Sequence, residues 1–443
     1  MGVAPPQPVP EGLVARVRSD MRWQRAARGQ FPPGELGFST ARTRQFERDP
    51  LPLLLRLYEE YGPVYSIRLL YAPIVFAIGP EANHYITVSG ASNFRWRDGG
   101  MGDLIPLLGD GLLTTDGDYH RRARRIMLPA FHREQIAAAR DVMAEEAERA
   151  IAGWRSGDRL DLYAWTRQLA LRVAMRALFG FDARRSPEMA HKFEKALSYW
   201  GRAYVAQMIP GPWSPFAAMQ RARAWLDEVI FAEIRRRQAS GERGTDLLSL
   251  LMDARDEDGS RLSEQELRDQ VMTLLFAGHD TTTSTVTFLF YELARNPGDH
   301  DLDLAIDETL RMYPPAWIGP RRSIEPFELC GVRVPGGVLV NYSSWVSHHL
   351  AEVFPEPFEF RPERFTPEAR AALSKGAYVP FGGGSRTCIG MRFGLLEVRT
   401  IAAAILERFR LELADPGLVP SIRQMPTLSP RGGLPVVVSE RAA

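Results

Sequence analysis

The chain has 443 residues, of which 45% are hydrophobic and 25% charged, and its formal net charge is +1. This composition is typical of a globular protein with a large core, and the balanced charge argues against a polyanionic partner such as nucleic acid. The two cysteines, Cys330 and Cys388, are too few for a disulfide framework or a four-thiolate zinc site, which indicates a reducing compartment.

The N-terminal half is predicted to be mainly helical after a short β segment. Residues 1–30 are rich in proline and predict an irregular extension. They contain no apolar run long enough for a signal peptide or membrane span, so we expect a cytoplasmic protein. Residues 64–79 hold two apolar, β-branched runs around a turn-like Ala72-Pro73, which predicts a hairpin. From about Asp118 to Phe290, apolar residues recur at intervals of three and four, as in helices.

A cationic helix face is predicted in GDYHRRARRIMLPAF. His120 and Arg124 are four residues apart and project from one face, as do Arg121 and Arg125. Such a face is usually solvated surface. It could also hold a carboxylate or phosphate, which arginine binds with two parallel hydrogen bonds.

The longest predicted helix begins at a capping box formed by Ser263 and Glu266 and stops at Asn296-Pro297. About thirty residues span roughly 45 Å of helix, and a helix so apolar should run through the centre of the molecule. Its middle carries the polar insertion 278–283, GHDTTT. One interpretation is a kink with threonines bonding back to carbonyls. We favour a local opening of the helix for a small ligand and water, with Asp280 and Thr281 delivering protons.

The C-terminal part mixes a short helix, strands and a last long helix. Glu308 and Arg311 lie three apart on a helix ended by Pro314-Pro315, a spacing that usually makes a solvated ion pair. Residues 331–346 predict short strands and turns. No linker-like tract divides the chain, so we predict a single domain over residues 1–443, mainly α with a small β-rich part.

The stretch GAYVPFGGGSRTCIGMRFG, residues 376–394, places Cys388 behind three consecutive glycines and an arginine. Glycine is costly to order, so this run indicates a backbone that turns tightly or lets another group approach closely. A lone cysteine is more often a small buried hydrophobe. These residues alone leave both interpretations open.

Taken together, these motifs resemble the cytochrome P-450 family of haem-thiolate monooxygenases. The family's cysteine-loop signature is matched by Phe381, Gly384, Arg386, Cys388 and Gly390. Its central-helix signature is matched by Ala277, Gly278, Asp280, Thr281 and Thr282. Its Glu-x-x-Arg pair is Glu308 and Arg311, and its later Pro-Glu-Arg-Phe is residues 362–365. The motifs follow the family's order, and the similarity runs from about Pro32 to the end.

The resemblance implies the cytochrome P-450 fold, with the long helix over a haem b (iron protoporphyrin IX) whose axial ligand is the Cys388 thiolate. The start of the following helix should lower the pKa of this thiol, and thiolate donation favours O–O cleavage. The other residues implied to bind the haem are Phe381, Gly384 and Gly390 of the loop, Ala277 and Gly278 of the helix, and the propionate contacts His120, Arg124, Arg321 and Arg386. Asp280 and Thr281 match the proton-delivering acid–alcohol pair. Glu308, Arg311 and Arg364 match a structural network of buried charges.

The implied activity is insertion of one oxygen atom from O2 into a hydrophobic small molecule. The chain shows no flavin module, so electrons from NAD(P)H would arrive through a ferredoxin or flavodoxin and its reductase. Residues that could dock this partner are Arg121, Arg122, Arg125 and Arg392. We expect a monomer without a membrane span. The alternatives are a peroxygenase using hydrogen peroxide, which the presence of Asp280 and Thr281 disfavours, and a non-catalytic haem sensor.

The residues that could contact the substrate are mostly apolar and lie before and within the predicted central helix, after it, and near the C-terminus. Candidate pocket residues, each of which could equally be core packing, are Trp96, Met101, Leu104, Leu108, Met272, Phe276, Ala277, Ala316, Trp317, Ile318, Thr427 and Leu428. This apolar and aromatic set suits a fatty acid, terpenoid, carotenoid or steroid. The link from the central helix to the Glu308 helix is shorter than in the family, so either the protein is shortened or a segment is missing between His300 and Asp301.

Overall fold

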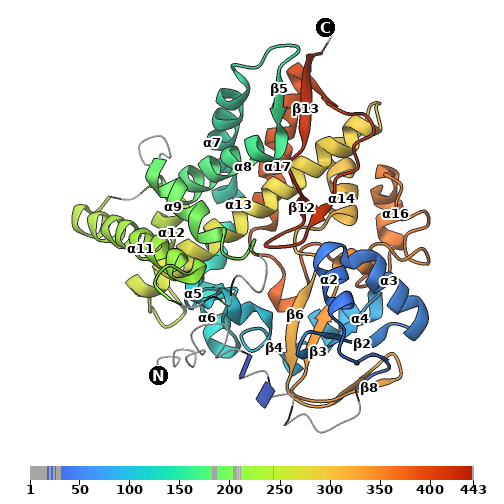
Figure 1. Ribbon diagram of the computed structural model, residues 1–443. Coiled ribbons are helices and arrows are strands. Elements are labelled where there is room, and N and C mark those ends of the chain that lie inside the picture. The colour runs from blue at the N-terminus through green and yellow to red at the C-terminus, as the bar shows by residue number, and fades with distance from the viewer. Residues whose placement is uncertain are drawn as a thin grey trace.

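The computed structural model describes residues 17–18, 21–22, 25, 31–181, 187–202, 207, 209, 211–242 and 244–441. Most of the irregular extension predicted over residues 1–30 lies outside these residues. In the described part, helices form most of the molecule and a β-rich region lies at one side (Figure 1). The fold class is therefore as predicted.

The helices gather around one long central helix. They are α2 (Thr40–Arg48), α3 (Pro50–Tyr61), α4 (Pro80–His84), α5 (Ile105–Leu108), α6 (Gly117–Met127), α7 (Arg133–Ile151), α8 (Leu162–Val173), α9 (Pro187–Leu197), α11 (Pro215–Ser240), α12 (Leu247–Asp253), α13 (Glu264–Arg295), α14 (Leu302–Met312), α15 (Ser344–Ser347), α16 (Pro367–Ala372) and α17 (Met391–Arg408). None of the described helices is both long enough and apolar enough to cross a membrane.

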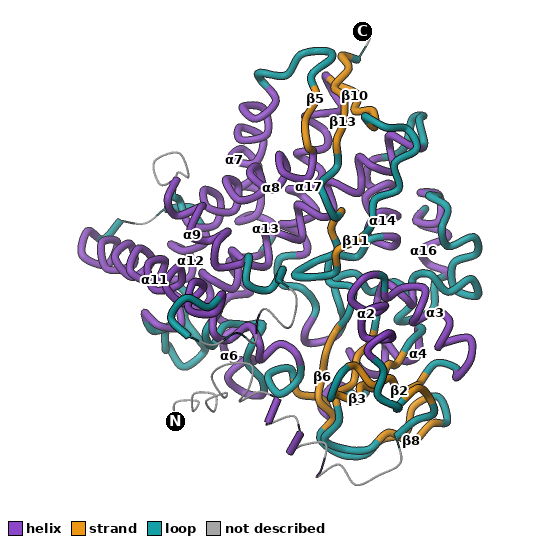
Figure 2. The backbone as a smooth tube through the Cα atoms, viewed as in Figure 1, coloured by secondary structure: helices purple, strands orange, loops and turns teal. Residues whose placement is uncertain are grey.

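Within the described residues, the strands form one larger sheet and three small ones. Figure 2 shows where the strands lie among the helices. The larger sheet has the order β1 (Gly34–Glu35), β2 (Val64–Leu69), β3 (Ala72–Ala77), β9 (Leu339–Tyr342), β6 (Gly319–Ser323) and β4 (Phe94–Arg95). A second sheet has the order β10 (Phe409–Leu413), β13 (Pro435–Glu440) and β5 (Arg159–Asp161). The two-stranded sheets pair β11 (Ile422–Arg423) with β12 (Ser429–Pro430), and β7 (Phe327–Leu329) with β8 (Val332–Val334).

The predicted hairpin is confirmed, but its turn lies earlier than expected. Strands β2 and β3 pair antiparallel from Val64 opposite Ala77 to Leu69 opposite Ala72. The turn is therefore at residues 70–71, and Pro73 lies inside β3. Pro73 lies opposite Arg68 of β2, and β9 pairs with β3 only from Ile74 onward, so on the β9 side no strand needs the missing N–H of this proline.

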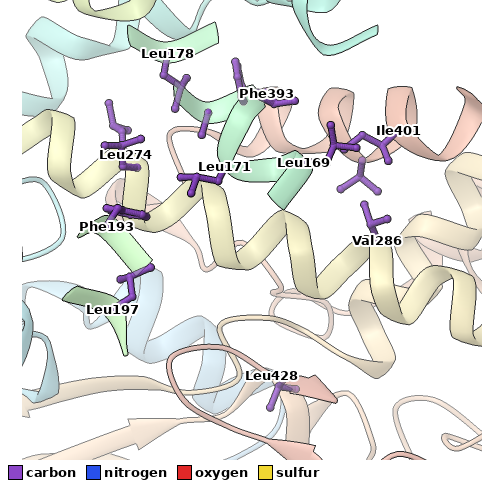
Figure 3. Close-up of a cluster of buried hydrophobic side chains, with 14 of the residues drawn as sticks. Leu169, Leu171, Leu178, Phe193, Leu197, Leu274, Val286, Phe393, Ile401 and Leu428 are labelled. Atoms are coloured by element: carbon purple, nitrogen blue, oxygen red, sulfur yellow. The ribbon is translucent and has the colours of Figure 1, made fainter. Parts of the chain in front are cut away.

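Helix α13 runs through the centre, as predicted, and begins at the predicted capping box. Its apolar side chains pack against neighbouring helices (Figure 3). Leu274 and Val286 of α13 lie in one cluster with Leu169 and Leu171 of α8 and Ile401 of α17, all nearly inaccessible to solvent. Burial of this kind stabilises by about 1.5–3 kcal/mol per side chain. The packing fixes α13 against α8 on one side and α17 on another.

The predicted local opening of α13 is wrong. The helix is α-helical without interruption from Glu264 to Arg295. The hydroxyl of Thr281 donates to the carbonyl of Ala277 at 2.6 Å, and that of Thr283 donates to the carbonyl of His279 at 2.8 Å. Because these hydroxyls find acceptors on the preceding turn, the polar insertion is accommodated within a regular helix.

Only six residues connect α13 to α14, so the short link predicted from the sequence is present in the structure. It consists of residues 296–301, and its last residue, Asp301, is the N-cap of α14. The Asp301 carboxylate accepts from the backbone N–H groups of Asp303 at 2.9 Å and Leu304 at 3.1 Å. Two capping bonds thus start α14 directly after this short link.

Candidate active site

A cavity of about 1000 Å³ lies beside α13, at the upper end of the size range of ligand pockets. Its walls come from α2, α6, α13, α17, β9 and the loop that carries Cys388. The cavity therefore collects segments that are far apart in the sequence. Most of the sequence-predicted site residues meet there.

The cysteine loop takes its shape from its glycines. The backbone N–H of Cys388 donates to the carbonyl of Phe381 at 2.9 Å, which closes the loop. Gly382 and Gly384 have φ of 69° and 61°, and a Cβ on Gly384 would lie 2.3 Å from the carbonyl oxygen of Thr87. Only glycine fits there. Phe381, Cys388 and Gly390 all line the cavity.

The Cys388 thiol opens onto the cavity, deep inside the molecule. Burial raises the pKa of this thiol, while the backbone N–H of Gly390 and the guanidinium of Arg124 lower it by less. The amide at the helix start lowers the pKa of the thiol as predicted, but desolvation raises it by more. A coordinated metal ion supplies the charge that keeps such a thiol deprotonated.

Three of the predicted basic residues, His120, Arg124 and Arg386, line the cavity. Arg124 donates to the carbonyl of Thr387 at 2.7 Å, and Arg386 donates to the Asp116 carboxylate at 2.7 Å. Trp96 is close to two guanidinium groups, with Arg386 at 4.9 Å and Arg321 at 3.6 Å from its ring centroid. Arg321 is buried just behind the wall.

Arg321 and the neighbouring Arg322 of β6 have different surroundings. Arg322 donates to the carbonyls of Asp98 at 2.8 Å and Gly337 at 2.9 Å, so it ties the sheet to a loop. Arg321 is only 2% exposed and stacks on Trp96 beside Arg386. Arg321, rather than Arg322, therefore adds positive charge to the cavity wall.

This basic cluster has the character of an anion site. Burial and the charges of Arg386, Arg124 and Arg121 lower the pKa of His120 to about 3. The pKa of Arg386 falls to about 10 because burial, Arg321 and Arg124 outweigh the attraction of Asp116. Desolvation is the largest cause in both cases, and repulsion between neighbouring charged groups adds to it. A bound dicarboxylate would relieve this repulsion, and haem carries two propionates, so the cluster fits that cofactor.

The structure separates the two members of the predicted proton-delivery pair. Thr281 lines the cavity, together with Ala277 and Gly278. The Asp280 carboxylate is 2% exposed and turned toward α8, 3.4 Å from Arg167 Nη1 and 3.3 Å from His279 Nδ1. It has no hydrogen bond among the described residues. Arg167, which the sequence did not single out, therefore holds Asp280 away from the cavity.

A second missed residue is Glu397 of α17, which lines the cavity. It is 1% exposed and accepts a hydrogen bond from Thr282 Oγ1 at 3.1 Å. Burial raises the pKa of this carboxyl to about 8, and the Thr282 bond lowers it by less. The sequence could have indicated this residue, because Glu397 is the single carboxylate in the apolar run LLEV of the last helix.

The candidate pocket residues divide into two groups. Those that line the cavity are Trp96, Met101, Leu104, Phe276, Ala277, Ala316, Trp317, Ile318 and Thr427. Leu108, Met272 and Leu428 do not line it, so their assignment to the pocket was wrong. All three are fully buried in the hydrophobic core.

The predicted charge network lies outside the cavity. Arg311 donates to both oxygens of Glu308, at 2.7 and 2.8 Å, and neither side chain is exposed. Arg364 Nε is 3.4 Å from the same carboxylate. Arg311 also donates to the carbonyls of His348 at 2.9 Å and Pro357 at 2.8 Å. These bonds tie α14 to the segment that precedes the cysteine loop, as a structural network would.

The chain is similar to known proteins in both sequence and fold. The model of the family described as "Cytochrome P450" matches residues 38–299 and 302–433. Cyclooctatin synthase of Streptomyces melanosporofaciens is 35% identical over 424 residues, 87% of this chain and 90% of that one. Cyclooctat-9-en-7-ol 5-monooxygenase of the same organism is 34% identical, over 82% and 85%. The solved structure of retinoic acid-bound cyanobacterial CYP120A1 superposes with a TM-score of 0.81 at 27% identity, over 93% and 99%.

Proposed function

Since this chain belongs to the cytochrome P450 family and is a P450 monooxygenase, we propose that it hydroxylates a hydrophobic terpenoid-type molecule with electrons from an external redox partner. The observation that carries the choice of substrate is the apolar wall of the cavity, formed by Met101, Leu104, Phe276, Trp317 and Ile318. Two relatives are named for cyclooctatin chemistry, and a structural neighbour binds retinoic acid. The compounds in these names have hydrocarbon frameworks with few polar groups.

The haem that the family brings is proposed to be haem b, held by this chain's own residues. Cys388 would bind the haem iron through its thiolate, and Phe381, Gly390, Ala277 and Gly278, which line the cavity, would contact the macrocycle. Gly384 does not line the cavity, so its role would be to shape the cysteine loop. His120, Arg124 and Arg386 would hold the propionates, with the buried charge of Arg321 beside Trp96. When bound, the haem supplies the activation of O2, and substrate, O2, two electrons and two protons give the alcohol and water.

Asp280 and Thr281 are proposed to pass a proton across α13. Thr281 faces the cavity, whereas Asp280 faces α8 and Arg167. Arg167 is also 3.4 Å from Glu194, whose side chain is 41% exposed. Glu194, Arg167 and Asp280 thus connect the outer surface to α13. In this proposal Arg167 is a positioning residue that holds the Asp280 carboxylate ready to receive protons.

The redox partner is proposed to be a ferredoxin or flavodoxin that docks near the start of α17. Two of the candidate arginines are engaged elsewhere, since Arg122 pairs with Glu266 at 2.8 Å and Arg125 with Asp256 at 2.6 Å. Arg121 pairs with Asp118 on the surface. Arg392 is exposed at the second position of α17, close to Cys388, and is the strongest candidate. Cytoplasmic location and a monomeric state stay predictions.

Optical titration of the ferric protein tests the proposed substrate class. A substrate that displaces water from the iron shifts the Soret band, so cyclic terpenoid alcohols should give a saturable shift. The matched variant Ala316→Trp narrows the cavity beside Trp317 and should weaken this shift at least tenfold, about 1.4 kcal/mol, with an unchanged ferrous–CO band. Saturable shifts with fatty acids and none with terpenoids would refute the assignment.

A further inference from the structure

Asn341 is a polar side chain in an apolar part of the cavity wall. It belongs to β9, lines the cavity and is 6% exposed. Its side-chain amide forms no hydrogen bond within the described residues. Buried amides almost always have a partner, and one left without a partner is costly. The unpaired amide of Asn341 therefore indicates a ligand that supplies the missing hydrogen bonds.

The nearest side chains in the sheet cannot pair with this amide. Strand β9 lies between β3 and β6, and this register places Phe76 on one side of Asn341 and Pro320 on the other. Leu339, two residues earlier on β9, shares the face of Asn341 because side chains alternate along a strand, and it lies opposite Ile74. All four of these side chains are apolar.

The face of the sheet that carries Asn341 continues into the aromatic wall of the cavity. The ring of Phe76 is 6.2 Å from that of Phe46, and the ring of Phe46 is 5.9 Å from that of Trp317. Phe46 comes from α2, which lies beside the larger sheet (Figure 1). Phe46 and Trp317 both line the cavity, as Asn341 does. A hydrocarbon framework packed on these rings would therefore have the amide within its reach.

Other polar groups of the wall are already bonded or are covered. The hydroxyls of Thr281 and Thr285 donate to carbonyls of the preceding turn of α13, at 2.6 and 2.9 Å. The amide nitrogen of Gln424 donates to two backbone carbonyls, at 2.9 and 3.2 Å. The hydroxyl of Thr273 has no partner, but the backbone of Gly111 covers it so closely that a Cβ there would lie 1.9 Å away. Asn341, by contrast, has both a donor and an acceptor to offer.

We propose that Asn341 hydrogen-bonds an oxygen atom that the substrate already carries, so the substrate is a terpenoid-type alcohol or ketone rather than a plain hydrocarbon. This inference rests on the proposed function and specifies the polar group of its substrate. A carboxamide accepts from a hydroxyl through its oxygen and donates to a hydroxyl or keto oxygen through its nitrogen. The apolar wall holds the framework, and Asn341 sets its orientation. An earlier reaction must therefore install the hydroxyl or keto group.

Optical titration of the ferric haem protein with matched ligands tests this anchor. The ligands are a cyclic terpene hydrocarbon, its alcohol and its ketone. Wild type should bind the oxygenated ligands about tenfold or more tightly than the hydrocarbon, because the hydrocarbon leaves the amide unpaired. Asn341→Leu, which is similar in size, should lose this preference through weaker binding of the alcohol and ketone. Equal affinities in wild type, or an unchanged preference in Asn341→Leu, would overturn the proposal.

Further variants separate hydrogen bonding from packing. Asn341→Thr keeps a donor and an acceptor and suits a strand, so it should retain part of the preference. Thr273→Val removes the covered hydroxyl and should retain all of it, and loss of the preference in this variant alone would overturn the proposal. An unchanged ferrous–CO band shows that each variant is folded. If only steroids or fatty acyl compounds shift the Soret band, the proposed terpenoid class fails. The same comparison, made with an alcohol and a hydrocarbon of the class that binds, then decides the role of Asn341.

Discussion

At the scale of single residues, the hydrogen bonds of the buried His348 ring are compatible only with its neutral form, so its protonation should affect the stability of the fold. It is fully buried, and the backbone N–H of Val379 donates to its Nε2 at 3.0 Å. The Nδ1 atom lies 3.1 Å from the carbonyl oxygen of Arg311 and so carries the proton. An imidazolium would turn Nε2 into a donor facing another donor. Burial, Arg311 and His349 accordingly hold the pKa of His348 well below 6.5.

This arrangement predicts that the fold weakens in mild acid. Because the folded-state pKa of His348 is depressed, the unfolded chain binds the extra proton as pH falls below about 6.5. The free energy of unfolding should then fall by up to about 1.4 kcal/mol per pH unit for this group. Urea unfolding at several pH values measures the slope. His348→Gln retains a hydrogen-bond acceptor and a donor but cannot titrate, so the slope of the free energy of unfolding against pH should decrease by the contribution of one proton. An unchanged slope would contradict the assignment.

The sequence could place residues at the site but could not say which way each points. Arg386 and Cys388 reach the cavity together because one tight loop carries both, and His120 and Arg124 do so because they lie one turn apart on α6. Successive residues on a helix point about 100° apart. Asp280 therefore faces α8 when Thr281 faces the cavity. That α8 offers Arg167, and that α17 brings Glu397 to Thr282, depends on packing between helices.

At the scale of elements, the start of α13 offers a direct stability test. Ser263 Oγ accepts from the backbone N–H of Glu266 at 3.2 Å, and the Glu266 carboxylate accepts from the backbone N–H of Ser263 at 2.8 Å. Ser263→Ala should lower the free energy of unfolding by about 1 kcal/mol, measured by chemical denaturation. Ser263→Asp keeps an acceptor at the cap and should stay near wild type. Equal losses in both variants would show that the cap is not the cause.

Elements were predictable where a periodic pattern was long enough. The hairpin of β2 and β3 and the 32-residue helix α13 have clear patterns, and both are present. Two-residue strands such as β4 and β11 exist only because a partner strand pairs with them, so no local pattern announces them. The polar insertion in α13 was misinterpreted because threonine hydroxyls can satisfy themselves on the preceding turn.

At the scale of the whole molecule, the cavity joins parts of the chain that are far apart in the sequence. Its walls come from α2 and β9 on the sheet side and from α6, α13 and α17 on the helical side. The basic cluster alone draws His120 from α6, Arg386 from the cysteine loop and, through Trp96, Arg321 from β6. A cofactor bound there would contact these segments together, so it would bind only when they are assembled.

Haem loading should therefore stabilise the whole fold. A ligand that binds only the folded state, present at a thousand times its Kd, adds about 4 kcal/mol, so the thermal midpoint should rise with haem concentration. Paired thermal scans of apo and reconstituted protein measure this rise. Cys388→Ala removes the axial ligand but keeps the basic cluster, so its rise should be smaller than that of the wild type and larger than zero. Equal midpoints with and without haem would mean that the cavity is held open by the protein alone and that haem does not bridge its walls.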